Sequence, residues 1–315
     1  MRLDAWGPVA ALVLLFIAFS IASPRFATVT NLQNMADAAS VTIVVAIGMT
    51  FVILAGGIDL SVEGVMAVSA LVVSQVVLNF RNDLDLGYLG ILLAILIGLL
   101  FGILNGLVQR GLRIPSIIST LAVASMGLGV ATVLYGPSAP VLGDQTLSGW
   151  ALEKWFGFSR LTYVALAVIV LAYVLQRWTI LGRAAFTLGG GEDHARNSGV
   201  PVVRYMIVLF AVAGLLYGLA GVMSTARLGA GLVTAGSGQM FAGITAVVVG
   251  GTFLGGGRGG VLQSVVGALI ITVLANGMIL AGVSPYLQQA IQGALIVGVI
   301  VLTSWPLRER LRVIK

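Results

Sequence analysis

Long apolar runs without a charged side chain alternate along the chain with short segments that carry almost all of its charge. The uncharged windows are residues 5–24, 38–58, 64–80, 86–109, 114–143, 161–176, 205–226, 228–257 and 259–307. Most approach the roughly 20 residues with which a helix crosses a bilayer, and the last is long enough for two. The pattern predicts an all-α, polytopic membrane protein with about ten transmembrane helices, in which residues 1–315 form a single domain.

The turns between these windows set approximate helix limits. The outer stretch 136–160 contains Trp150 and Trp155, which are typical interfacial anchors, and 150–156 is expected to form a short helix on the membrane surface. We expect the membrane helices at residues 6–22, 39–55, 62–80, 88–108, 115–135, 161–178, 205–224, 240–254 and 261–281, followed by a last helix that ends before Trp305.

Lysine and arginine are unevenly distributed between alternate connections. If both termini are cytoplasmic, the inner segments carry twelve of the 17 basic residues and the outer segments five. This is the asymmetry expected of the positive-inside rule, and it accounts for the net charge of +6. The composition agrees with a membrane protein: 59% of residues are hydrophobic, 9% are charged, and mean hydropathy is +1.08. The basic balance therefore indicates topology, and no nucleic-acid partner is expected.

The stretch 54–64 interrupts two uncharged windows with the carboxylates of Asp59 and Glu63, and it contains Gly56 and Gly57. An aspartate at the centre of a bilayer costs about 2.5–3.5 kcal/mol on insertion scales, so this carboxylate has to face water or be hydrogen-bonded. Two interpretations stay open. Asp59 lines a polar path or ends a broken helix, or else Asp59 or Ser61 caps the next helix within a short inner turn. Glu63 would lie in the first turn, where the helix dipole favours negative charge.

The longest inner connection, residues 179–204, contains a second candidate site. A glycine run precedes Glu192 and Arg196, which can pair at i, i+4, and the segment 192–198 is expected to form a solvent-facing helix of about two turns. Two turns are unstable alone, which favours docking against a partner subunit over a plain polar connector. His194, the only histidine, is interpreted as a surface residue that cannot make a metal site alone.

Two sequence echoes indicate an internal repeat. Residues 53–60 resemble residues 247–254, which contain Gly250 and Gly251, and Asn105 resembles Asn276 in being followed by glycine and later by proline. Duplicated halves are common in transporters, with the site at their interface. The two asparagines either hydrogen-bond across helices or contact the substrate. Gly98, Gly102 and Gly106 follow one another at four-residue spacing, which is expected to serve close helix packing.

Several absences exclude other function classes. The chain has no cysteine, only two lysines and no Gly-x-x-x-x-Gly-Lys-Ser/Thr sequence, so it cannot bind ATP with a P-loop. It also has no metal-binding or nucleophile motif. We therefore expect no catalytic residues, no metal and no cofactor.

The same motifs resemble the permease subunits of ribose-type monosaccharide ABC importers over nearly the whole chain. The resemblance lies in residues 54–61 (Leu-Ala-Gly-Gly-Ile-Asp-Leu-Ser), 188–191 with 198–200, 226–228 and 246–252. Two departures leave the substrate open. Glu63 stands where the family usually has small residues, and Gln239-Met240-Phe241 stands where the family commonly has acidic ones.

The resemblance implies a function and an assembly. The chain would be the permease of an importer in the cell inner membrane and would translocate a monosaccharide or related small polar solute. Its partners would be a cytoplasmic ATP-binding subunit, a periplasmic solute-binding protein and a second permease copy, in a homodimer or heterodimer. The alternatives are an ion-coupled secondary transporter, with a proton on Asp59 or Glu63, and an ABC permease for amino acids or nucleosides.

The candidate site residues form two sets. The candidate pathway or hinge residues are Gly56, Gly57, Asp59, Ser61, Glu63, Asn105, Phe241, Gly250, Gly251 and Asn276. The resemblance places coupling to the ATPase on Gly190, Gly191, Glu192, Asp193, His194, Ala195, Arg196, Asn197, Ser198 and Gly199.

Overall fold

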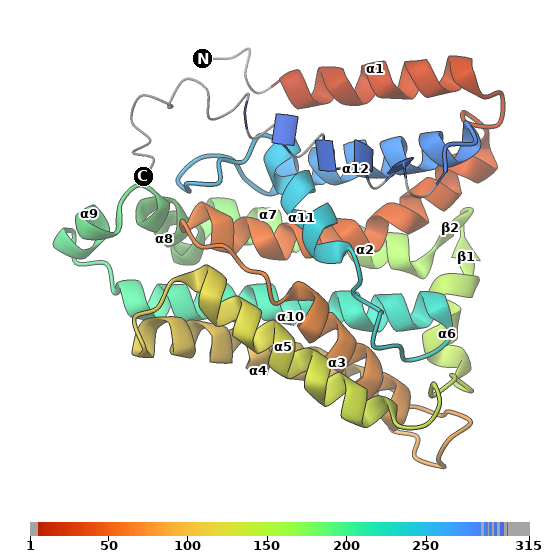
Figure 1. Ribbon diagram of the computed structural model, residues 1–315, viewed down its shortest axis with the longest axis horizontal. Helices are drawn as coiled ribbons and strands as arrows, with labels where there is room; N and C mark the ends of the chain where they lie inside the picture. The colour runs from red at the N-terminus through yellow and green to blue at the C-terminus, as the bar shows by residue number, and fades with distance from the viewer. Residues whose placement is uncertain are drawn as a thin grey trace.

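Helices make up nearly all of the computed structural model, which describes residues 6–284 and parts of 287–301 (Figure 1). The last predicted membrane helix lies largely outside the described residues, and the basic tail lies wholly outside them. The elements are α1 Gly7–Ala22, α2 Val29–Leu54, α3 Val62–Val76, α4 Gly87–Gly111, α5 Ser116–Tyr135, α6 Gln145–Leu152, β1 Lys154–Trp155, β2 Phe158–Ser159, α7 Arg160–Trp178, α8 Ile180–Gly189, α9 Glu192–Asn197, α10 Val202–Leu228, α11 Gln239–Val249 and α12 Val261–Leu280.

The prediction of an all-helical membrane protein is confirmed at the level of class. Within the described ranges, six helices are long and apolar enough to cross a membrane: α2, α4, α5, α7, α10 and α12. The apolar helices α1, α3, α8 and α11 are shorter. The total of about ten spans and the internal repeat stay predictions.

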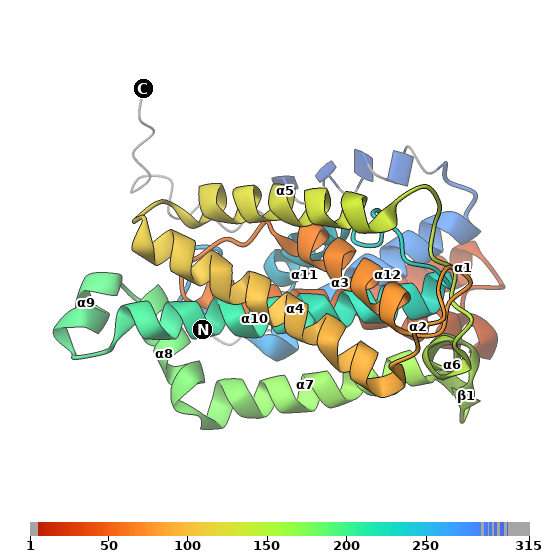
Figure 2. The same cartoon turned by 90° about the horizontal axis from the view of Figure 1, so that it is seen from below.

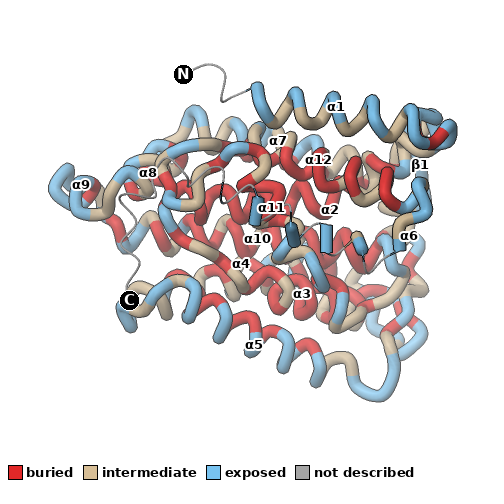
Figure 3. Tube along the Cα trace, turned by 45° about the horizontal axis from the view of Figure 1, so that its top comes forward, coloured by how far each residue is buried: buried red, intermediate tan, exposed pale blue. Residues whose placement is uncertain are grey.

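The centre of the bundle is formed by α2 and α10, which pack against each other, and α10 also packs directly against α3 and α4 (Figure 3). Every residue from 39 to 54 in α2 is buried, as expected for a helix that is apolar on all sides. The outer helices α1, α4, α5 and α7 instead expose large apolar side chains along one face. In a membrane protein that outer face contacts lipid or another subunit.

Glycines allow α4 and α10 to pack with their backbones in contact. A Cβ atom on Gly98 would lie 2.4 Å from the carbonyl oxygen of Gly214, and one on Gly214 would lie 2.3 Å from that of Gly98. Gly102 and Gly106 meet α10 in the same way, which confirms that the four-residue glycine spacing in α4 serves close helix packing.

The structure corrects three local predictions. Residues 180–189 form the helix α8, where a loop was expected, because the apolar side of this segment packs against α2 and α7. The surface helix begins earlier than predicted, at Gln145, where Asp144 caps it. Residues 154–159 form a short antiparallel hairpin in place of helix.

The two predicted groups of basic residues lie at opposite ends of the bundle. The long helices run side by side, with α9 at one end and α6 and the hairpin at the other (Figure 2). The described members of the larger group, all at the α9 end, are Arg110, Arg113, Arg177, Arg183, Arg196, Arg204 and Arg258. Arg25, Arg81, Lys154, Arg160 and Arg227 lie at the opposite end.

The α4–α10 contact predicts the effect of one added methyl group. Gly98→Ala should lower the free energy of unfolding by about 1–3 kcal/mol, because the methyl group collides with backbone that cannot move aside. The measurement is the thermal unfolding midpoint of the purified protein in detergent. Gly129→Ala in α5 is the matched control, since its Cβ would meet nothing within 4 Å. Equal midpoints for the two variants would contradict the packing argument.

Candidate functional site

A non-helical segment crosses part of the bundle between α2 and α3. The chain leaves α2 at Leu54, and α3 begins part-way along the bundle (Figure 1). Two hydroxyl groups of α5 bind the intervening backbone: the Ile58 N–H donates to Ser116 Oγ at 3.0 Å, and the Leu60 N–H donates to Thr120 Oγ1 at 3.0 Å. Non-helical backbone at membrane depth persists only where such groups are satisfied or water reaches them. The break is therefore an ordered part of the bundle, held by side chains of α5.

Asp59 lies within this break and is 2% exposed. Its Oδ1 accepts hydrogen bonds from the Ser61 backbone N–H (2.9 Å) and from Ser61 Oγ (2.6 Å). Ser61 is the N-cap residue of α3, but its side chain makes no capping bond, and Asp59 does not bind the first turn of the helix. The interpretation that the Asp59 or Ser61 side chain caps α3 is therefore wrong, because these two residues hydrogen-bond to each other.

A buried polar cluster extends from Asp59 to two spanning helices. Asn105 of α4 donates from Nδ2 to Ser61 Oγ at 2.8 Å. Tyr217 of α10 is fully buried beside the Asp59 carboxylate. Asp59 Oδ2, Asn105 Oδ1 and the Tyr217 hydroxyl are buried without a hydrogen-bond partner among the described residues. The cluster joins α4 and α10 to the break between α2 and α3, and it retains unused hydrogen-bonding capacity at its centre.

A second break, between α11 and α12, meets the first. The Gly257 N–H donates to the carbonyl oxygen of Leu54 at 2.9 Å, and Gly56 lies beside Gly256. Gly189, at the end of α8, fits between them: a Cβ there would lie 2.0 Å from the Leu54 oxygen and 2.3 Å from the Gly257 nitrogen. Any side chain at 189 would separate the two breaks. Gly250 and Gly251 lie at the start of the second break, close to this contact.

Hydroxyl and amide groups that the sequence reasoning missed support the second break. Thr50 of α2 donates to Ser264 Oγ of α12 at 2.6 Å, and the Gly260 N–H donates to Thr252 Oγ1 at 3.1 Å. The Val261 N–H donates to Gln176 Oε1 of α7 at 2.7 Å. In the sequence these residues could be recognised as polar positions in otherwise apolar helices. Their spacing did not indicate which residues they would bond.

Glu63 and Phe241 lie at a different contact, where α3 meets α11. The Gly238 N–H, just before α11, donates to Glu63 Oε1 at 2.9 Å. Thr42 of α2 donates to Gln239 Oε1 at 3.2 Å, which also holds the start of α11. Phe241 is 59% exposed in the first turn of that helix. The structure thus places Glu63, Gln239 and the exposed ring of Phe241 together at the N-terminal end of α11.

Asn276 does not join either break. It forms two hydrogen bonds with Asn31, at 2.9 and 3.0 Å, near the end of α2 remote from Gly56. A paired amide of this kind fixes α12 against α2 and favours the packing interpretation of Asn276.

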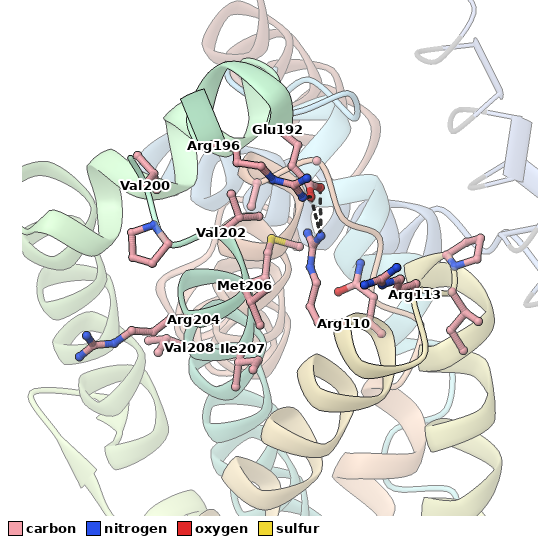
Figure 4. Close-up of a pocket in the computed structure, with 17 residues that line it drawn as sticks. Arg110, Arg113, Glu192, Arg196, Val200, Val202, Arg204, Met206, Ile207 and Val208 are labelled. Atoms are coloured by element: carbon pink, nitrogen blue, oxygen red, sulfur yellow. Dashed lines mark hydrogen bonds and ion pairs between the residues drawn. The ribbon is translucent and has the colours of Figure 1, made fainter. Parts of the chain in front are cut away.

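The predicted short helix is present as α9, at one end of the bundle (Figure 4). Ala195 is buried, while Asp193, His194, Arg196, Asn197 and Ser198 are exposed. Glu192 accepts from Arg110 of α4 at 2.9 and 3.0 Å and from Arg196 at 3.2 Å, which confirms the i, i+4 pair. An ion pair therefore ties this exposed helix to a spanning helix of the bundle.

Comparison with known proteins finds likeness over most of the chain. Residues 31–300 match the family described as branched-chain amino acid transport system / permease component. The chain is 36% identical to the ribose import permease protein RbsC of Escherichia coli (strain K12), with 84% of the chain and 82% of that protein covered. It is 37% identical to RbsC of Bacillus subtilis (strain 168), covering 85% and 83%. It is 35% identical to the L-arabinose transport system permease protein AraH of E. coli K12, covering 85% and 80%. No solved structure matches the chain.

The polar cluster predicts a stability cost for removing one hydroxyl group. Ser61→Ala should lower the free energy of unfolding by about 1–3 kcal/mol, because it leaves Asn105 Nδ2 and one bond of Asp59 without partners in a buried site. Thermal unfolding in detergent measures this. Ser125→Ala in α5 is the matched control, since its exposed hydroxyl bonds only the Leu121 carbonyl of its own helix. A Ser61→Ala midpoint equal to that of the control would sink the argument.

Proposed function

The chain belongs to the branched-chain amino acid transport system / permease component family, and from this premise we propose that it is the membrane-spanning permease subunit of an ATP-binding cassette importer for a monosaccharide or related small polar solute. The proposed class of solute rests on the similarity to ribose and arabinose permeases, which covers 84–85% of this chain and 80–82% of those relatives. ATP hydrolysis in such importers resides on a separate subunit, so this chain is not an enzyme.

The proposed assembly places α9 on the cytoplasmic ATP-binding subunit. The coupling segment comprises residues 190–199, within the connection 179–204. Its exposed polar side chains and its ion pair with Arg110 support this role, because a force on α9 would reach α4 directly. The larger group of arginines lies at the α9 end of the bundle, which supports a cytoplasmic placement of α9 and of both termini. The permease itself would lie in the inner membrane.

The two breaks form the proposed moving part. Gly56, Gly57, Gly250 and Gly251 would act as hinges, while Asp59, Ser61 and Asn105 hold the first break in shape. Two permease copies, each with about ten spans, would open a shared path alternately outward and inward. A periplasmic solute-binding protein would deliver the solute.

The cargo has one specific competitor. The description of the family refers to branched-chain amino acids, which supports an amino-acid permease as the second candidate. Uptake of labelled ribose, arabinose and leucine by vesicles containing the whole importer separates the two. An ion-coupled carrier has less support, because Asp59 is buried and bonded to Ser61.

Replacing residues 192–198 with a Gly/Ser linker should leave the permease in the membrane but abolish ATP-driven uptake, because the docking helix is lost. The measurements are membrane abundance, copurification of the ATP-binding subunit and solute uptake. A shorter Gly/Ser replacement, of residues 81–85 at the opposite end of the bundle, is the control. Copurification at the normal yield without residues 192–198 would count against the docking role.

Asp59→Asn should reduce uptake more than it reduces membrane abundance, because the amide alters the bonding of the break while keeping its size. Asp83→Asn in an exposed loop is the matched control and should change neither quantity. Equal losses of uptake and abundance in Asp59→Asn would assign Asp59 a purely structural role.

A further inference from the structure

A groove of about 1440 Å³ opens between the end of α4 and the start of α10, next to α9 (Figure 4). Its walls are largely apolar and include Ile114, Met206, Ile207 and Val208. Its lining also reaches Ala55 and Gly56, at the first break. The groove thus lies at the charged end of the bundle, against the last residues of α4 and the first two turns of α10.

The rim of the groove carries excess positive charge. Arg110, Arg113 and Arg196 lie around Glu192, the single acidic residue of the lining. Arg110 and Arg196 both bind that carboxylate. Arg113 lies beside Arg110 and makes no ion pair or side-chain hydrogen bond within the described part of the chain, whereas Arg204 points away from the others (Figure 4). Arg113 and Arg204 therefore both lack a counter-charge among the described residues, and Arg113 is the one that lies beside Arg110 (Figure 4).

The backbone at Arg113 is strained. Its φ is +55°, in the left-handed region that costs a residue with a side chain about 1 kcal/mol or more relative to glycine. Arg113 is the residue directly after the C-cap Leu112 of α4, a position where helices commonly end in the left-handed conformation, most often with glycine. Here an arginine occupies a position whose backbone suits glycine, directly at the rim of the groove.

We propose that this groove binds an anionic phospholipid, with its phosphate at Arg113 and Arg110 and an acyl chain along the apolar wall of α10. The charge pattern and the shape favour this occupant together. Basic pockets between membrane helices suit phosphate headgroups, and the apolar side chains of the first two turns of α10 suit the start of an acyl chain and not a free ion. The lipid would supply the charge that Arg113 lacks without displacing Glu192. The inference requires only that the chain spans the membrane.

The test uses the purified full-length permease, without partner subunits, in detergent micelles containing phosphatidylglycerol or phosphatidylcholine. Native mass spectrometry counts the bound lipid. We expect retained phosphatidylglycerol, little retained phosphatidylcholine, and no displacement by excess inorganic phosphate. Equal retention of the two lipids would overturn the proposal, and displacement by inorganic phosphate would assign the rim to a free anion.

Three variants locate the site. Arg113→Gly removes the guanidinium at a position whose φ glycine adopts freely, so it should fold and bind phosphatidylglycerol about fivefold more weakly, since each basic residue near an anionic headgroup contributes about 1 kcal/mol. Arg113→Lys keeps the charge and should retain most of the binding. Arg258→Gln removes an exposed positive charge at the same end of the bundle but outside the groove lining, and it should bind as the unmodified chain does. Equal losses in Arg113→Gly and Arg258→Gln would show general surface attraction and overturn the site. Because the readout is lipid binding to the isolated chain, it stands or falls independently of transport and of the ATP-binding subunit.

Discussion

The structure depends on satisfying non-helical backbone inside an apolar bundle. An unpaired N–H or C=O group in a bilayer costs several kcal/mol, so a break in a membrane helix survives only where neighbouring groups replace the lost hydrogen bonds. At the first break the hydroxyl groups of Ser116 and Thr120 serve this purpose. At the second, Thr252 and Gln176 do so. Each break is thereby tied to a different spanning helix, and the Gly257 N–H joins the two breaks through Leu54.

Close glycine packing makes these bonds possible. Gly98 and Gly214 bring the backbones of α4 and α10 into contact, and this places Asn105 within reach of Ser61. Gly189 allows α8 to approach both breaks at once. Since α8 leads directly into α9, the exposed helix at the end of the bundle is two residues of chain away from the contact between the breaks. A connection of only two residues, Gly190 and Gly191, keeps an attached subunit close to the contact between the breaks.

Apart from the buried carboxylates of Asp59 and Asp144, the charged side chains of the described residues are at least partly exposed. Of the buried side chains at the first break, only Asp59 is ionisable as an acid, and Ser61 supplies two donors to it. Glu63 is partly exposed and bonded to Gly238. The arginines gather at the α9 end, where Glu192 neutralises part of their charge and Arg113 is left without a partner. The unpaired charge of Arg113 lies beside an apolar groove, and this combination favours an anionic lipid as its partner.

Local chemistry was readable from the sequence. The uncharged windows determined the helical membrane class, the arginine distribution separated the two ends of the bundle, and the Glu192 and Arg196 spacing predicted α9. The glycine spacing of α4 likewise predicted close packing. These features depend on residues within one or two helical turns of each other, so hydropathy, charge and periodicity suffice to find them.

Only the tertiary structure decided what the breaks contact. Ile58 is bonded to Ser116, Leu54 to Gly257, and Asn105 to Ser61, although long stretches of chain separate the members of each pair. The sequence could not reveal that Asp59 is occupied by Ser61 and leaves α3 uncapped, or that Asn276 pairs with Asn31 away from both breaks. In an apolar bundle many helix arrangements bury similar surface, and the one that forms gives the backbone N–H groups of Ile58, Leu60 and Val261 partners on other helices.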